Sequence, residues 1–415
     1  MDAVRLAALA GEPLDWRFKG LPASWWGRTP THICAAAPNL VDEGAVGPLC
    51  VLRAEALTHN LATMAGWCRD RGVELAPHGK THMAPQLLAR QFEAGACAVT
   101  VATISQVRTY RAFGVRDFIL ANELVDAAAL RWVAAELTAD PDFTLVCWVD
   151  SVAGVRQMAS QLDAAGARRP VDVCVEVGMA GGRTGCRDAS TVDEVARAAA
   201  DCPALRLIGV AGYEAALGHD VTPGALARVT GYLSELRSAV ERLADVFETD
   251  SVVVTAGGST YFDAVAEVLA TGWAAGRTVR TIIRSGCDLT HDDGLYARTS
   301  PLGRSGGRGL LPALQVWAQV VSRPEPDLAV LTMGRRDVSF DQDMPVPLDL
   351  SHSAVTKLND QHAYLKLEPK DRAGVEVGSW LRFGVSHPCT TFDKWQMIPV
   401  LDGDDRVVDL IRSFF

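Results

Sequence analysis

The stretch Glu74-Leu-Ala-Pro-His-Gly-Lys-Thr-His-Met83 places a lysine where an apolar segment runs out into a turn broken by proline and glycine. Two histidines, His78 and His82, lie on either side of Lys80. An ordinary lysine is a solvated charge on the protein surface. Neither helix packing nor strand packing, however, explains why two histidines lie beside this one. Neutral imidazoles and apolar chain around a cation favour the uncharged amine, which is the form that reacts with carbonyl groups. The stretch therefore indicates a lysine presented for Schiff-base chemistry.

Around this stretch, short runs rich in Val, Ile and Leu recur, each followed by an Ala-rich amphipathic stretch. The runs are residues 73–76, 97–104, 117–121, 144–149, 171–177, 205–210, 251–255 and 281–284. The helix candidates between them include residues 85–93, 105–113, 152–165, 191–200 and 222–246. Apolar strands separated by helices are typical of a parallel sheet covered on both faces. Eight such units in about 240 residues predict an α/β fold, a closed TIM-type (β/α)8 barrel, with an open doubly wound sheet as the competing architecture.

The character of the sequence changes at about residue 290, where glycine and proline become frequent and the Ala-rich helices disappear. Short alternating runs take over at residues 313–321, 329–333, 363–367, 379–383 and 397–401. They predict a C-terminal antiparallel β domain over residues 290–415, after a barrel domain over residues 48–289. Residues 1–47 are expected to be an irregular lead-in with one short helix at its start. The run 47–53 is expected to pair with the β domain.

Composition limits the classes of partner. The chain has 415 residues, 48% of them hydrophobic and 22% charged, which is typical of a globular protein with a substantial core. Its formal net charge of −10, without a run of Lys or Arg, disfavours nucleic acid and membrane surfaces as partners. We find neither a signal peptide nor an apolar run long enough to span a bilayer. The ten cysteines form no CxxC pair, which indicates reduced thiols and a cytoplasmic protein.

The stretch Gly257-Gly-Ser-Thr260 follows a Val-rich run and precedes a helix-like stretch. Tandem glycines let backbone N–H groups approach an anion, and hydroxyls at a helix N-terminus complete a phosphate cradle. The same residues would also suit a plain turn in which serine or threonine caps the helix. Both readings stay open on these residues alone.

The stretch Ser386-His-Pro-Cys-Thr-Thr-Phe-Asp-Lys-Trp395 places the imidazole of His387 and the thiol of Cys389 in one turn. Imidazole and thiolate are ligands that suit zinc. Two protein ligands leave positions open for water or substrate, as in catalytic sites, whereas structural zinc normally takes four protein ligands. An isolated His-x-Cys also arises by chance.

The stretch Pro77-His-Gly-Lys-Thr-His82 resembles the Pro-His-x-Lys-Thr-His signature of the D-serine dehydratase and D-threonine aldolase family, a branch of the alanine-racemase-like (fold type III) enzymes. In that family the lysine carries pyridoxal 5′-phosphate (PLP) as a Schiff base. The resemblance implies that Lys80 holds PLP, with His78 beside it. It also implies a phosphate site in the loops after the seventh and eighth strands, made by Gly257, Gly258, Ser259, Thr260, Ser285 and Gly286.

Two further stretches resemble elements of this family. Residues 178–185 are similar to its Gly-x-x-Arg-x-Gly element, with two extra residues, and Arg183 takes the place of an arginine near the PLP hydroxyl or the substrate. Arg183 could instead be a surface ion-pair residue. Tyr213-Glu214 is similar to the family's Tyr-x-Gly pattern, although alanine follows where glycine is often seen. Tyr213 could bond the cofactor ring nitrogen, or be a half-buried core aromatic.

The segment that ends at Trp395 resembles the zinc-binding segment of the D-serine dehydratase branch. The resemblance as a whole implies a PLP- and zinc-dependent dehydratase of D-β-hydroxy amino acids such as D-serine or D-threonine, which gives a 2-keto acid and ammonia. Lys80 would remove the Cα proton, and zinc on His387 and Cys389 would activate the β-hydroxyl as a leaving group.

Other readings remain at this stage. An aldolase acting on D-threonine or 3-hydroxy-D-aspartate would use the same parts, and a non-catalytic PLP-binding protein is a remoter alternative. A homodimer is expected from the fold-type resemblance and from edge strands that the β domain would otherwise expose.

Overall fold

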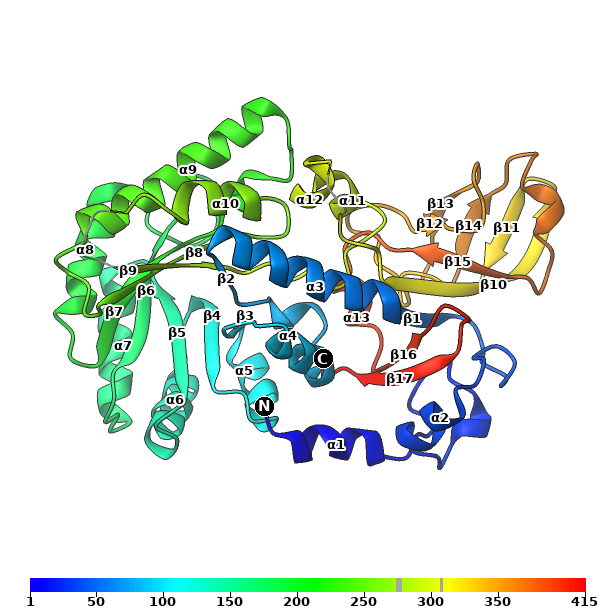
Figure 1. Cartoon of the computed structure of the whole chain (residues 1–415), viewed down its shortest axis with the longest axis horizontal. Coiled ribbons are helices and arrows are strands. Elements are labelled where there is room, and N and C mark those ends of the chain that lie inside the picture. Colours follow the sequence, from blue (N-terminus) through cyan, green and yellow to red (C-terminus); the bar gives the residue numbers. More distant parts are fainter. Residues whose placement is uncertain (274–277, 307–308) are drawn as a thin grey trace. The chain divides into compact units, whose positions relative to one another are not determined.

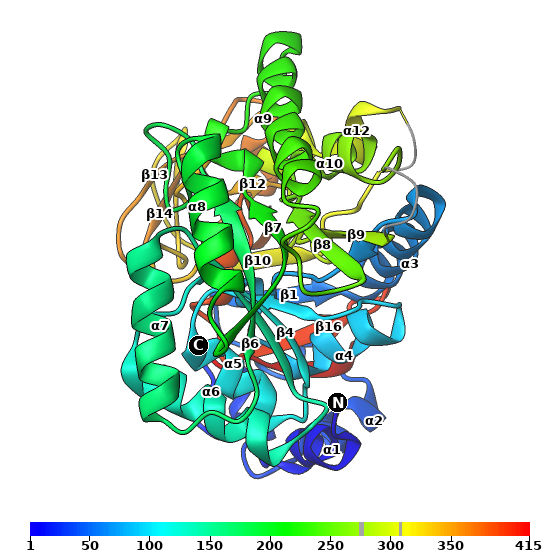
Figure 2. The same ribbon diagram turned by 90° about the vertical axis from the view of Figure 1, so that its left-hand side faces the viewer.

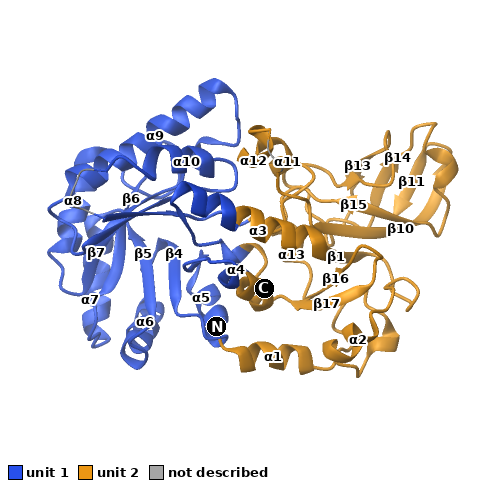
Figure 3. Cartoon of the chain, in the orientation of Figure 1, with its two compact units in different colours: residues 1, 65–80, 91–286 blue, residues 2–64, 81–90, 287–415 orange. Residues whose placement is uncertain are grey.

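The computed structural model describes residues 1–273, 278–306 and 309–415 (Figure 1). They divide into two compact units (Figure 3). Unit 1 comprises residues 1, 65–80 and 91–286, and unit 2 comprises residues 2–64, 81–90 and 287–415. Residues 48–64, 81–90 and 287–289, which were predicted to belong to the barrel domain, thus lie in unit 2. The chain passes from one unit to the other directly after Lys80 and directly after Gly286.

Unit 1 is built around a parallel sheet with eight strands among the described residues. The strands are β2 (Glu74–Leu75), β3 (Val99–Val101), β4 (Asp117–Glu123), β5 (Thr144–Val149), β6 (Val171–Val177), β7 (Leu205–Gly212), β8 (Ser251–Ala256) and β9 (Thr278–Ile283). Their order is β2-β9-β8-β7-β6-β5-β4-β3. The backbone N–H groups of Cys97 and Thr100 donate to the carbonyls of Leu75 and Pro77 at 2.8 and 2.9 Å. These bonds join β2 and the segment after it to β3 and the segment before it, which stand at the two ends of this order. The sheet therefore closes, and the predicted barrel is confirmed.

Helices alternate with these strands, as predicted. They are α3 (Ala54–Arg71), α4 (Pro85–Glu93), α5 (Ile104–Ala112), α6 (Ala127–Ala139), α7 (Val152–Ala164), α8 (Ala189–Ala200), α9 (Pro223–Arg242) and α10 (Phe262–Leu269). Several begin at a side chain that accepts a backbone N–H of the first turn, namely Thr103, Asp126, Ser151, Asp188 and Thr222. Helix α8 packs against β6 and β7 (Figure 2). Helices α3 and α6 were not among the predicted helices, although the buried residues of α6 follow the spacing of one helix face.

The barrel interior is filled by side chains rather than open. Buried residues that share one cluster there are Ala76, Ala98, Ile119, Trp148, Cys174, Ile208, Ala211, Val253 and Ile282. Beyond this cluster, at the carboxyl ends of the strands, the barrel carries polar residues such as Glu176 and Thr255. In barrels of this kind that end carries the active site.

Unit 2 contains a second sheet, which is mostly antiparallel, as predicted. Its strands are β1 (Leu49–Arg53), β10 (Leu314–Glu325), β11 (Leu328–Leu331), β12 (Val346–Pro347), β13 (Ala354–Leu358), β14 (Ala363–Lys366), β15 (Trp380–Gly384), β16 (Met397–Leu401) and β17 (Val407–Arg412). The expectation for residues 47–53 is confirmed, because β1 pairs with β10. Strand β1 also pairs with β16, and this pairing is parallel.

The first 47 residues contain more helix than expected. Besides α1 (Ala3–Gly11), they form α2 (Pro30–Ala36), which begins at Thr29, whose side chain accepts the N–H of His32. The side chain of Ile33 is fully buried in a cluster with Leu49 and Leu410 of the sheet. Tertiary packing therefore stabilises a seven-residue helix that is too short to be recognised from its own pattern.

Short elements complete the described chain. They are α11 (Leu295–Thr299), α12 (Pro301–Arg304), α13 (Cys389–Phe392) and the 3-10 turns η1 (Ala23–Trp25), η2 (Gly79–Thr81), η3 (Glu214–Leu217) and η4 (Arg372–Gly374). None of the helices within the described ranges combines the length and apolar character needed to cross a membrane.

Candidate active site

Lys80 lies in the turn η2, just after the first barrel strand, and its side chain is exposed. The turn is held from α5, because the hydroxyl of Tyr110 donates to the carbonyl of Gly79 at 2.7 Å. A Cβ atom on residue 79 would lie 2.7 Å from both the Tyr110 ring and the Val99 side chain. Only glycine fits between these neighbours. The backbone that presents Lys80 is thus fixed by close packing.

His78 lies at the carboxyl end of β2, and its backbone N–H donates to the carbonyl of Ser285 at 2.9 Å. Within the described part of the chain, its buried Nδ1 atom has no hydrogen-bond partner. Burial, and then the positive charges of Lys80 and Arg284, hold the pKa of the imidazole well below its usual range. His78 is therefore neutral at pH 7. Its buried, unpaired nitrogen fits a bound polar or aromatic group, as the PLP expectation requires.

The glycine loop after β8 departs from the expected phosphate cradle. The N–H groups of Gly257 and Gly258 donate to the two carboxylate oxygens of Glu214, at 2.9 and 2.7 Å. Glu214 is fully buried, and Gly257 has a φ of +94°, which favours glycine. These two N–H groups are thus occupied by a side chain of the same chain. The sequence analysis quoted Glu214 only as the neighbour of Tyr213 and did not foresee this role.

The other members of the predicted phosphate site come together. The hydroxyls of Ser259 and Ser285, from the loops after β8 and β9, lie 2.9 Å apart. Thr260 is buried and its hydroxyl lies 3.0 Å from Nδ1 of His219. Two hydroxyls from adjacent strand ends are suited to bind a phosphate oxygen. The structure therefore fits a phosphate with these hydroxyls better than with the amides of the two glycines.

Arg183 and Tyr213 also meet, although they come from different loops. The guanidinium carbon of Arg183 lies 4.4 Å from the centre of the Tyr213 ring. A Cβ atom on Gly258 would lie 3.3 Å from this ring, so the glycine loop passes close beside it. The inserted loop is anchored by Gly185, whose N–H donates to Asp150 at 3.1 Å. The two extra residues therefore do not carry Arg183 away from the strand ends.

Three charged residues at the same strand ends were given no role on the basis of the sequence. Arg284 is buried and donates to the Thr255 hydroxyl and the Gly212 carbonyl, both at 2.6 Å. Glu123 is the last residue of β4, and Glu176 is the penultimate residue of β6. Burial, followed by the charge of Glu176, raises the pKa of Glu123 to about 8. A charged residue at the end of an apolar run is the sequence pattern that could have indicated these three residues.

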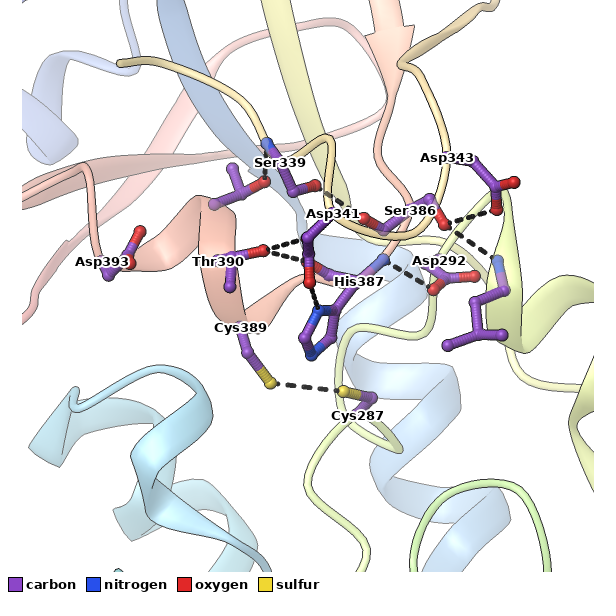
Figure 4. A network of polar contacts seen from close by, with 12 residues as sticks. Cys287, Asp292, Ser339, Asp341, Asp343, Ser386, His387, Cys389, Thr390 and Asp393 are labelled. Carbon is purple, nitrogen blue, oxygen red and sulfur yellow. Dashed lines mark hydrogen bonds and ion pairs between the residues drawn. The ribbon is translucent and has the colours of Figure 1, made fainter. Parts of the chain in front are cut away.

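In unit 2, His387 occupies a strained position that other residues stabilise. Its φ is +68°, and its backbone N–H donates to the buried carboxylate of Asp292 at 3.0 Å. Its ring Nδ1 lies 2.5 Å from Oδ2 of Asp341 (Figure 4). The other ring nitrogen faces the sulfur atoms of Cys389 and Cys287 (Figure 4). A carboxylate that orients one imidazole nitrogen and leaves the other to face a thiol is typical of metal-binding histidines.

Cys389 begins α13 and is half-buried. Its sulfur lies 3.2 Å from the Thr81 hydroxyl and 3.7 Å from the sulfur of Cys287. The hydrogen bond with Cys287, and then the hydrogen bond and charge of His387, hold the pKa of Cys389 well below its usual range, against the effect of burial. The thiolate form is the one that binds metals. Cys287 was not singled out in the sequence.

A network of hydrogen bonds fixes the loop that carries these donors (Figure 4). The Ser386 hydroxyl donates to Asp343 at 2.9 Å, and the Ser339 hydroxyl donates to the carbonyl of Ser386 at 2.6 Å. The Thr390 hydroxyl donates to the second oxygen of Asp341 at 2.6 Å. Among the described residues, no group of three or more His, Cys, Asp or Glu side chains is placed to hold a metal ion. The assignment of His387 and Cys389 as metal ligands stays a prediction.

Two family models match the sequence. Residues 52–270 match the model described as alanine racemase, N-terminal domain, and residues 313–401 match the model described as putative serine dehydratase domain. Among curated proteins, D-threonine aldolase from an Arthrobacter species is 28% identical over 359 residues, which cover 86% of this chain and 89% of that protein. The two matched segments lie on either side of residue 290, where the sequence changes character.

Solved structures share the fold. A D-threonine aldolase from Filomicrobium marinum has a TM-score of 0.76 at 24% identity and covers 89% of this chain and 95% of its own. A D-threo-3-hydroxyaspartate dehydratase from Delftia sp. HT23 has a TM-score of 0.74 at 23% identity, with coverages of 89% and 98%. One structure of that dehydratase, with a cysteine replaced by alanine, is described as metal-free. These likenesses establish an alanine-racemase-like fold.

Proposed function

Because the chain belongs to the alanine racemase N-terminal domain family, whose model covers residues 52–270, we propose that it is a PLP-dependent lyase that dehydrates D-β-hydroxy amino acids. The products would be a 2-keto acid and ammonia. The observation that carries the proposal is the pair formed by His387 and Cys389, with Asp341 bound to the far nitrogen of the imidazole. This pair lies in the segment that matches the putative serine dehydratase domain.

Several residues of unit 1 would hold the cofactor. Lys80 would supply the amine for its aldehyde, His78 would line its ring, and the hydroxyls of Ser259 and Ser285 would bind its phosphate. Arg183, stacked on Tyr213, would bind an oxygen of the cofactor or the substrate carboxylate. PLP, when bound, delocalises the negative charge that develops on Cα.

Lys80 is the proposed base for the Cα proton. It lies on a turn held by Tyr110, and among the described residues no other lysine stands at a strand end of the barrel. A base on one face of the cofactor removes a proton only from that face, so turnover should be confined to D-isomers. Comparable rates with L-serine would contradict this assignment.

His387 and Cys389 would hold a zinc ion or another divalent metal. The metal supplies a Lewis acid that makes the β-hydroxyl a better leaving group. In the neutral imidazole, Asp341 accepts the proton on Nδ1, which leaves the lone pair on the nitrogen that would bind the metal.

An aldolase is the second candidate, and the 28% identity to a D-threonine aldolase favours it. It would use the same base and cofactor but break the Cα–Cβ bond. The deciding experiment incubates purified protein, PLP and zinc with D-serine, D-threonine and 3-hydroxy-D-aspartate. Keto acid and ammonia support the dehydratase, glycine with an aldehyde supports the aldolase, and no product from any of the three contradicts both. Chelation should abolish turnover, and zinc should restore it.

A further inference from the structure

The metal-binding turn has a neighbour that the proposed reaction does not use. The sulfur of Cys287 lies 3.7 Å from the sulfur of Cys389, although the two residues are 102 positions apart in the chain (Figure 4). Both residues belong to unit 2, and Leu295 and Tyr296 pack around them. The structure contains both as reduced cysteines. We propose that Cys287 and Cys389 form a reversible disulfide when the metal is absent and a peroxide is present.

The geometry permits this bond. A disulfide has a sulfur–sulfur distance of about 2.05 Å, so the two atoms must approach by about 1.7 Å. Rotation of a cysteine side chain moves its sulfur without moving the backbone. Leu295 and Tyr296 pack in the same cluster as Cys287, and the sulfur of Cys389 lies within 3.7 Å of its sulfur.

Exposure sets the order of the two steps. Cys389 is half-buried, whereas Cys287 is only 4% exposed, so a peroxide reaches Cys389 first. The Cys389 sulfur attacks one peroxide oxygen, the O–O bond breaks, and the product is a sulfenic acid and water. The Cys287 sulfur then attacks the sulfenic sulfur, the S–O bond breaks, and the hydroxyl leaves as water with the Cys287 proton. Two thiols and one peroxide thus become one disulfide and two waters.

The consequence rests on the proposed function, in which Cys389 is a metal ligand. A sulfur in a disulfide carries no thiolate and cannot bind zinc, so the bound metal and the disulfide exclude each other. Zinc should protect the pair, and oxidation of the metal-free protein should prevent zinc from binding until a thiol reductant restores Cys389. The pair would make metal loading dependent on the redox state.

The test uses the full-length protein with zinc bound and after chelation. Each form is treated with hydrogen peroxide, digested without reduction and analysed by mass spectrometry, while thiol titration follows the ten cysteines. We expect the peptides with Cys287 and Cys389 to be joined in the metal-free protein, with a loss of two thiols that dithiothreitol reverses. Bound zinc should slow the reaction at least tenfold.

Two variants serve as controls. Cys287→Ser should yield no joined peptide and should accumulate a sulfenic acid on Cys389, which dimedone traps. Cys202→Ser replaces a half-buried cysteine of unit 1 and should still form the joined peptide. Absence of the joined peptide in the metal-free wild type overturns the thiol pair and leaves the proposed function intact. Equal rates with and without zinc overturn the ligand role of Cys389.

Discussion

At the scale of single residues, the proposed chemistry depends on one amine. Lys80 follows Gly79, a residue that cannot carry a Cβ atom in this structure. The side chain is exposed, while the buried nitrogen of the neighbouring His78 has no partner among the described residues. The amine is thus available for a covalent bond, and the residue beside it has an unused polar atom for the same ligand.

Replacing Lys80 with alanine removes the amine that would bind the cofactor. We expect Lys80→Ala to lose both the visible absorbance of covalently bound PLP and all turnover, because a methyl group cannot form the bond. Absorbance spectra and trapping with borohydride measure this. Lys366→Ala, on the exposed end of β14, is the matched control and should keep the absorbance. A trapped adduct in the Lys80 variant would sink the assignment.

Asp341 is proposed to act through His387 rather than on the substrate. Asp341→Asn keeps an acceptor for the ring Nδ1, at present 2.5 Å away, but removes its negative charge. We expect zinc affinity to fall roughly tenfold to a hundredfold while PLP absorbance is unchanged. Competition with a chromogenic chelator measures the affinity. Asp393→Asn, at the end of α13, is the control, because the carboxylate of Asp393 pairs with Lys394. Equal affinities in the two variants would contradict the role of Asp341.

At the scale of elements, helix α5 positions the turn that carries Lys80. Its Tyr110 is fully buried, and the single hydrogen bond from the tyrosine hydroxyl to Gly79 crosses from the helix to η2. The loops after β8 and β9 are joined in a comparable way through Ser259 and Ser285. Catalytic side chains on loops thus take their positions from contacts with the helices and strands around them.

Removing the Tyr110 hydroxyl should loosen this turn. Tyr110→Phe leaves the buried carbonyl of Gly79 without its donor, at a cost of about 1–3 kcal/mol in the free energy of unfolding. PLP affinity should fall as well. Urea denaturation and cofactor titration provide the measurements. Tyr364→Phe, on β14, removes a hydroxyl that bonds only an exposed asparagine and should change little. Wild-type values for both quantities in Tyr110→Phe would show that α5 does not hold the turn.

At the scale of the whole molecule, a buried carboxyl makes stability depend on pH. Asp293 has a buried oxygen without a partner among the described residues, and burial, followed by the charge of Asp292, raises its pKa to about 7. The folded protein therefore holds this proton more tightly than the unfolded chain does. The associated stability is complete below about pH 4 and is lost as the pH rises through 7.

Asp293→Asn should remove this loss. Between pH 4 and pH 8, the wild type should lose up to roughly 4 kcal/mol of its free energy of unfolding through this group, at 1.36 kcal/mol per pKa unit. The variant should not show this loss. Urea denaturation between pH 4 and pH 8 tests this. The control Asp404→Asn replaces an exposed aspartate and should follow the wild type. Parallel curves for Asp293→Asn and wild type would disprove the role of Asp293.

The sequence by itself determined the order of the elements and which reactive side chains stand together in two turns. Residues 144–149 and 171–177 form strands with the predicted bounds. Such a strand can be predicted because its apolar residues are consecutive in the sequence. The position of Gly257-Gly-Ser-Thr260 at a strand end also follows from consecutive residues. The same holds for the position of His387 and Cys389 in one turn. Short helices such as α2 escaped because their stability comes from burial against distant residues.

The tertiary structure alone decided which groups meet. Glu214 binds the amides of Gly257 and Gly258 across 43 and 44 positions, and Asp341 reaches His387 across 46. Cys287 meets Cys389 across 102 positions. No local pattern encodes such pairs, because each depends on the path of the backbone between its members. A sequence pattern reports which side chains are available, whereas only the folded chain determines which of their polar atoms are already occupied.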